Sequence, residues 1–270
     1  METIESIAEY INAVHNIVGQ CGNDISPTHV WFRGQENESW TLLPRLYRPN
    51  ENPFREREMF RDFKLRANEF ISIHPENDME FLFIMQHYGM PTRLLDWTES
   101  YLFALFFAVE SEDISVDAAV WILHPAQLNK FSGYEHRVPM SNNKVFLKYL
   151  LDIDAEERDE RKRIYASCAM AVRPRRCSAR IVAQRGMLTI HGNEMKSIDD
   201  YANTQETPFN LLKKINISGK SKSHIKKELL LAGISYSTLF LDLDGLSKEI
   251  SYRYSQNYMN TKITGGASAL

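Results

Sequence analysis

Apolar residues recur at intervals of three and four positions in several stretches of the chain, which predicts amphipathic helices. The first spans residues 3–18, and the others span residues 54–73, 79–88, 99–109 and 221–232. Gly19 follows the first helix, and Gly89 with Pro91 stops the third. Residues 101–109 are apolar throughout, so we expect a buried helix there, with Thr98 as its N-cap.

Strands are predicted where β-branched and aromatic residues cluster between turn residues. A short strand at residues 30–32 leads directly to Arg33 and Gly34, and residues 118–123 are typical of a central strand. Residues 180–191 resemble two strands separated by a break at Gln184. Further strands are expected at residues 39–43, 169–172, 210–217 and 238–241.

These elements predict an α/β (α+β) fold: one domain with a split, mostly antiparallel sheet and flanking helices. The chain shows no internal repeat and no clear linker, so we expect this domain to span residues 1–255. The polar, then Gly- and Ala-containing segment 256–270 is expected to be a flexible C-terminal tail. We also expect Arg33, Thr98 and Gln184 to face one cleft.

Composition supports a globular protein, since 43% of the 270 residues are hydrophobic and 11% are aromatic. The net charge of −3 gives no overall attraction to nucleic acid or membranes. Three scattered cysteines favour neither a disulfide framework nor a zinc site, and no metal is expected. No apolar run approaches the roughly 20 residues of a membrane helix. We therefore expect a soluble, cytoplasmic protein.

Basic residues cluster locally between positions 158 and 180. Such a cluster is either a solvated surface or a patch that contacts phosphates. In the second case, Arg173, Arg175 and Arg176 are the candidates for binding RNA. Asp242 and Asp244, in an Asp-x-Asp-Gly turn, fit a helix cap better than a metal pair. The cluster consists of Arg158, Arg161, Lys162, Arg163, Arg173, Arg175, Arg176 and Arg180.

Polar residues that could take part in catalysis or ligand binding gather between the third and fourth predicted helices. The turn around Gly89 and Pro91 carries His87, Thr92, Arg93, Asp96 and Thr98. Functional groups are commonly placed on loops that rigid elements hold in position. The glycine after Arg33 would likewise let a ligand or another backbone segment come close.

Four segments carry a family resemblance. They are Trp31-Phe-Arg-Gly-Gln35, then Gln86-His-Tyr-Gly-Met-Pro-Thr-Arg-Leu-Leu-Asp-Trp-Thr98 with Ala104-Leu-Phe-Phe-Ala108, then Arg180-Ile-Val-Ala-Gln-Arg-Gly186, and Leu239-Phe-Leu-Asp-Leu-Asp-Gly245. Together they resemble the FRG domain, a family named for its Phe-Arg-Gly tripeptide. The resemblance extends from about residue 10 to residue 250, and its central block is long and specific.

Within this family the layout is similar to that of ADP-ribosyltransferases of the arginine–serine–glutamate type. Their first-strand arginine grips the phosphate or ribose side of NAD, and Arg33 corresponds to it. Thr98, ahead of a helix rich in Ala and Phe, loosely matches the second motif. Gln184 stands where these enzymes have a glutamate, and an amide cannot accept a proton from a ribose hydroxyl. Asp96 or Glu99 could supply the missing negative charge.

The resemblance implies an ADP-ribosyltransferase with NAD as substrate, acting as an intracellular toxin or phage-defence effector. The acceptor would be a macromolecule, with RNA favoured over protein because of the basic cluster, and a partner protein could restrain the activity. Two alternatives remain: a non-catalytic module that binds a nucleotide or a partner, and a hydrolase that only cleaves NAD. The implied catalytic residues are Arg33, Asp96, Thr98 and Gln184, and the implied NAD-binding residues are Arg33, Gly34, His87, Thr92, Arg93 and Thr98.

Overall fold

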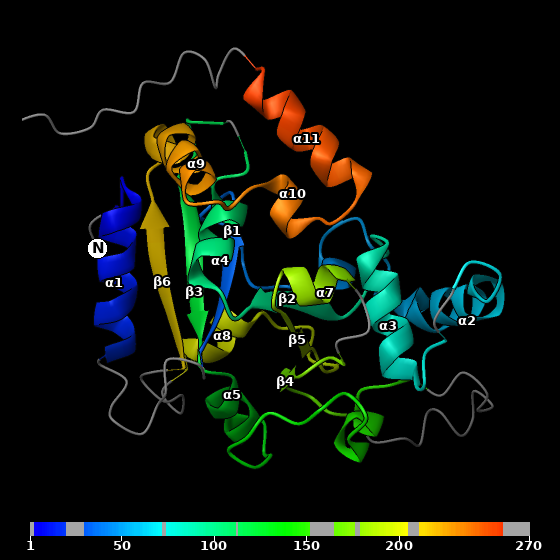
Figure 1. Cartoon of the computed structure of the whole chain (residues 1–270). Helices are drawn as coiled ribbons and strands as arrows, with labels where there is room; N and C mark the ends of the chain where they lie inside the picture. The colour runs from blue at the N-terminus through cyan, green and yellow to red at the C-terminus, as the bar shows by residue number, and fades with distance from the viewer. Residues whose placement is uncertain are drawn as a thin grey trace, which may run out of the picture.

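The computed structural model describes residues 3–19, 30–71, 74–111, 113–151, 165–175, 179–204 and 211–255. Its strands form one six-stranded antiparallel sheet in the order β4-β5-β2-β1-β3-β6 (Figure 1). The α/β class, the mostly antiparallel sheet and the flanking helices are thus as the sequence predicts. The strands are β1 (Trp31–Gln35), β2 (Leu94–Thr98), β3 (Ala118–Leu123), β4 (Met170–Val172), β5 (Gly186–Ile190) and β6 (Leu212–Ile217).

The sheet is split between its two middle strands. β1 pairs with β3 along its whole length, from Trp31 to Gln35, but it meets β2 only at Phe32 and Thr98. Beyond that pair the two strands separate, and β2 crosses away from β1 in Figure 1. The halves β4-β5-β2 and β1-β3-β6 are therefore joined at a fork, which we call the β1–β2 fork.

Helices cover both halves of the sheet (Figure 1). α4 lies against β1, α1 runs along the β6 edge, α3 lies beside β2, and α2 packs against α3. Three clusters of buried apolar side chains fill the space between these helices and the strands. The helices are α1 (Ile7–Gly19), α2 (Glu56–Ala67), α3 (Asp78–His87), α4 (Tyr101–Ala108), α5 (Pro125–Phe131), α7 (Ala179–Ala183), α8 (Ile198–Ala202), α9 (Lys222–Leu231), α10 (Tyr236–Leu239) and α11 (Leu243–Arg253).

Helix α4 is apolar on all sides because it is buried between β1 and the C-terminal helices. Ala104, Leu105, Phe106 and Ala108 are at most 2% exposed. The predicted cap at Thr98 is wrong: Ser100 is the N-cap, and its side chain accepts a hydrogen bond from the Phe103 N–H. Among the described helices, none is long and apolar enough to cross a bilayer.

Three predicted strands are wrong. Residues 39–43 are irregular because Leu42 bonds to the start of α8: its N–H donates to Asp199 Oδ1 at 2.7 Å, and its carbonyl accepts from Ile198. Residues 180–183 belong to helix α7, and residues 238–239 belong to α10, where Ser235 and Thr238 form a capping box. Tertiary contacts override short β-rich runs of this kind.

Two predicted helices are shorter than expected. The first begins at Ile7, because the Ile4 N–H bonds to the Asn216 carbonyl beside β6. The second ends at Ala67 instead of residue 73, with Phe70 left 83% exposed. The predicted tail 256–270 and Arg176 lie outside the described residues.

Candidate functional site

A cavity of about 1070 Å³ lies at the β1–β2 fork. Its walls come from both strands of the fork, from the end of α3, from the segment around α7 and β5, and from residues 240–248, which follow α10 and begin α11. Arg33, Thr98 and Gln184 all line it, as the sequence predicts. A volume of this size is sufficient for a dinucleotide-sized ligand.

Arg33 reaches across the fork from β1. Its Nη1 donates to the backbone carbonyl of Asp96 on β2 at 2.5 Å. Its Nε–H is buried and has no acceptor, and no carboxylate pairs with Arg33 among the described residues. Burial lowers the pKa of the guanidinium, while the Asp96 charge opposes this effect and Arg48 adds to it. Arg33 is therefore a part-buried cation that forms no direct ion pair with a described residue, although the Asp96 charge lies close enough to affect its pKa.

Gly34 has a packing role. A Cβ atom at this position would lie 1.9 Å from the Ala104 carbonyl oxygen and 2.6 Å from the Ala108 backbone nitrogen. The glycine thus allows the backbone of β1 to contact the backbone of α4. The small side chains of Ala104 and Ala108 leave room for this close approach. The close neighbour of Gly34 is another backbone segment, one of the two possibilities that the sequence left open.

Asp96 and Gln86 form a polar pair in the cavity wall. Asp96 is exposed, lies on β2 and accepts a hydrogen bond at Oδ2 from Gln86 Nε2 at 2.8 Å. Gln86, near the end of α3, in turn accepts one from the Thr92 hydroxyl at 2.5 Å. Thr92 itself is 1% exposed and does not line the cavity. Glu99, the alternative source of negative charge, does not line it either.

Thr98 and Gln184 connect β2 to the segment before β5. The Thr98 hydroxyl donates to the Gln184 backbone carbonyl at 2.7 Å and accepts from the Ser100 N–H at 3.0 Å. The Gln184 side chain donates from Nε2 to the Leu239 carbonyl at 3.2 Å. Both side chains therefore fix the local backbone as well as lining the cavity.

Arg93 lies away from the cavity and has a structural environment. It is 4% exposed, and its guanidinium forms a two-point ion pair with Glu56, with 2.7 Å between Nε and Oε1. Nη1 also donates to the Tyr149 carbonyl at 3.1 Å. The Glu56 carboxylate raises the pKa of Arg93 despite its burial. This buried pair attaches α2 to the start of β2.

His87 lines the cavity at the end of α3, where it is half-buried. Burial lowers its pKa, and the nearby Arg180 lowers it further, while Asp242 and Asp96 act in the opposite direction. The imidazole is therefore biased toward its neutral form, which can both donate and accept a hydrogen bond.

The cavity is also lined by residues that the sequence motifs did not assign to the site. Arg180 of α7 lies 4.8 Å from the ring centroid of Phe240, and Lys248 of α11 lies 5.7 Å from it. Arg48 also lines the cavity. The basic cluster of the sequence contains Arg180, but nothing local indicates that it faces Phe240, because the two are 60 positions apart.

The predicted RNA-contact residues are only partly described. Arg173 is exposed, whereas Arg175 lines the cavity and forms ion pairs with Glu76 and Glu80. Asp242 is the N-cap of α11 and accepts from the Gly245 N–H at 2.8 Å, so it is a cap, as the sequence favours. Within the described ranges, no group of His, Cys, Asp or Glu side chains could hold a metal ion.

The cavity-lining arginine of β1 and the polar turn before β2 both lie within one recognisable family segment. Residues 28–116 match the family model of the FRG domain. This FRG segment supplies Arg33, Gly34, Gln86 and Asp96, and also α4. It supports the FRG resemblance, while Gln184 and the wall formed by α7, Phe240 and α11 lie beyond it. Neither the curated proteins nor the solved structures contain a match to the chain.

Proposed function

We propose that the chain is an ADP-ribosyltransferase that uses NAD as donor and that the cavity at the β1–β2 fork binds NAD. The observation that carries the proposal is that Arg33, at the cavity, forms no direct ion pair with a described residue and has a buried Nε–H without an acceptor. Leaving a part-buried guanidinium without a hydrogen-bonded anion is costly, so its presence at a cavity favours an anionic ligand. The pyrophosphate of NAD is such a ligand, and a guanidinium can bind it through two parallel hydrogen bonds.

The remaining cavity groups fit the other parts of NAD. Breaking the bond between nicotinamide and ribose develops positive charge on the ribose, which a nearby carboxylate stabilises. Asp96 is the candidate carboxylate, since it lines the cavity and Glu99 does not. Gln184 can hydrogen-bond a ribose hydroxyl, and Phe240 offers a ring against which a base could stack.

RNA is the acceptor that we propose. Arg173 follows β4 directly, and Pro174 and Arg175 line the cavity, so basic residues adjoin the proposed NAD site. Glu76 and Glu80 pair with Arg175 and so weaken the attraction of this arginine for RNA phosphates. An enzyme that consumes NAD and modifies cellular RNA would inhibit growth, in keeping with a toxin or defence effector that a partner protein restrains.

The test measures nicotinamide release and label transfer from NAD in the presence of total cellular RNA or total protein. Arg33→Ala should abolish release, while Arg66→Ala, at an exposed arginine of α2 that does not line the cavity, is the matched control. Transfer to RNA should weaken steeply with salt. Equal activity of Arg33→Ala and the parent protein would refute the assignment of this cavity as the NAD site.

A non-catalytic nucleotide-binding module is the second candidate. It is favoured by the Thr98 hydroxyl, whose only proton is already donated to the Gln184 carbonyl, and by an amide in place of the expected glutamate. Such a module would bind NAD or a related nucleotide, as measured by calorimetry, but release no nicotinamide. A hydrolase would release nicotinamide without labelling RNA or protein.

A further inference from the structure

Three hydrogen bonds in the FRG segment run in one direction and end at Asp96. The Leu94 N–H donates to Thr92 Oγ1 at 3.3 Å, the Thr92 hydroxyl donates to Gln86 Oε1 at 2.5 Å, and Gln86 Nε2 donates to Asp96 Oδ2 at 2.8 Å. The three donors belong to the first residue of β2, to the turn before it and to the last part of α3. The chain of bonds begins at a buried backbone amide and ends in the cavity wall.

This order fixes the orientation of the Gln86 amide. A carboxylate only accepts hydrogen bonds, so the NH₂ end of Gln86 faces Asp96 and its carbonyl oxygen faces Thr92. The single proton of the Thr92 hydroxyl is then donated to that oxygen, while the hydroxyl accepts from the Leu94 N–H. Because Thr92 is buried, water does not compete for the hydrogen bond between Thr92 and Gln86. The Gln86 amide is therefore held as a donor to the Asp96 carboxylate.

Asp96 is free to act on a ligand in this arrangement. Its carboxylate forms no ion pair with any described residue, although Arg33 binds its backbone carbonyl. Gln86 occupies one oxygen, and the side chain lines the cavity. The protein therefore presents an oriented negative charge a short distance from the cation that we assign to the pyrophosphate.

We infer that Gln86 and Thr92 are positioning residues that hold Asp96 as the charge-stabilising carboxylate of NAD cleavage, an inference that rests on the proposed function. When the C1′–N bond breaks, its electron pair leaves with nicotinamide and the ribose carries positive charge. Asp96 stabilises that charge without changing its own protonation state. The acceptor hydroxyl then bonds to C1′ and releases its proton to solvent.

The first experiment compares kcat and KM for nicotinamide release. Gln86→Met and Thr92→Val remove one link each while keeping the side-chain volume, and each should lower kcat roughly tenfold to a hundredfold with little change in KM. Thr92→Ser, which keeps the hydroxyl, should restore most of the rate. Gln127→Met on α5, another part-buried helical glutamine that does not line the cavity, is the control.

The second experiment repeats Gln86→Met in an Asp96→Asn background. If Gln86 acts through Asp96, its substitution should then have little further effect on kcat. An equal loss in both backgrounds, or full activity of Thr92→Val, overturns the inference. Thermal melts identify a variant that fails to fold, and the comparison of Thr92→Ser with Thr92→Val then decides. If the parent protein releases no nicotinamide at all, the proposed function fails first.

Discussion

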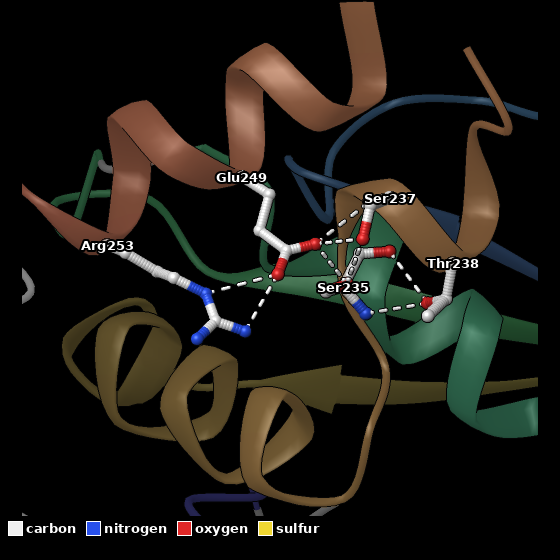
Figure 2. Close-up of polar contacts among 5 residues, drawn as sticks. All are labelled: Ser235, Ser237, Thr238, Glu249 and Arg253. Carbon is white, nitrogen blue, oxygen red and sulfur yellow. Dashed lines mark hydrogen bonds and ion pairs between the residues drawn. The ribbon is translucent and has the colours of Figure 1, made fainter. Parts of the chain in front are cut away.

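Replacing Glu249 by glutamine should loosen the C-terminal wall of the cavity. Glu249 is 8% exposed, and its carboxylate accepts hydrogen bonds on both oxygens (Figure 2). Oε2 accepts from the Ser235 hydroxyl at 2.5 Å and from the Ser237 hydroxyl and N–H, and Oε1 accepts from Arg253 Nη2 at 2.7 Å. Glutamine has an NH₂ group in place of one of these oxygens. That group would face either the donors of Ser235 and Ser237 or the guanidinium of Arg253, and it could accept a hydrogen bond from neither.

The magnitude follows from the pKa of Glu249. Hydrogen bonds from Ser235 and Ser237, with a further contribution from Arg253, lower this pKa from 4.5 to about 2, against the effect of burial. Each pKa unit corresponds to about 1.4 kcal/mol, so the ionised carboxylate contributes at most about 3 kcal/mol to the free energy of unfolding. The folded-state pKa is the lower one, so this contribution is complete above pH 4.5. It declines as the pH falls, and less than half remains by pH 3.

Urea unfolding of the parent protein and of Glu249→Gln, at pH 7 and at pH 3, measures this contribution. The difference in stability should be large at pH 7 and at least halved at pH 3. Glu58→Gln on α2, whose side chain is 44% exposed, is the control and should change stability by less than about 1 kcal/mol. A difference between parent and Glu249→Gln that is the same at both pH values would refute the reasoning.

Three further variants test packing and the site. Gly34→Ala places a Cβ against α4 backbone and should destabilise the protein by about 1–3 kcal/mol or more in urea unfolding; an unchanged midpoint would contradict the contact. Arg93→Met leaves Glu56 buried and unpaired and should cost about 3–5 kcal/mol, part of which Glu56→Gln in the same protein should restore. Gln184→Glu sets a carboxylate against the Leu239 carbonyl and should lower the melting temperature. A rise in its nicotinamide release would show that this position serves the ribose, whereas unchanged release would assign it to structure alone.

The sequence predicted the elements whose pattern is long and self-consistent. Helices α3 and α4 and strands β3, β5 and β6 lie where periodicity or β-rich composition placed them. It failed at short segments such as residues 238–241, whose conformation depends on distant partners. There the Ser235 capping box and the Glu249 carboxylate, 14 positions away, stabilise a helical turn that local composition does not suggest.

The same limit applies to the cavity. Arg33, Asp96 and His87 could be found because they lie in motifs with unusual residue types. The sequence could not separate the residues that line the cavity from those that support it. Arg93 and Thr92 stand three and four positions before Asp96, yet both are buried. Only the strand register and the partner groups, Glu56 for one and Gln86 for the other, distinguish them.

The β1–β2 fork is the place where the two halves of the sheet are most weakly connected. Only Phe32 and Thr98 pair across it, and the bond from Arg33 to the Asp96 carbonyl is a side-chain tie between the same two strands. A ligand that immobilises the guanidinium would therefore stiffen the sheet as a whole. Amide hydrogen exchange in β1 and β2 should slow when the cavity is filled, which makes exchange protection a readout of occupancy that needs no chemical turnover.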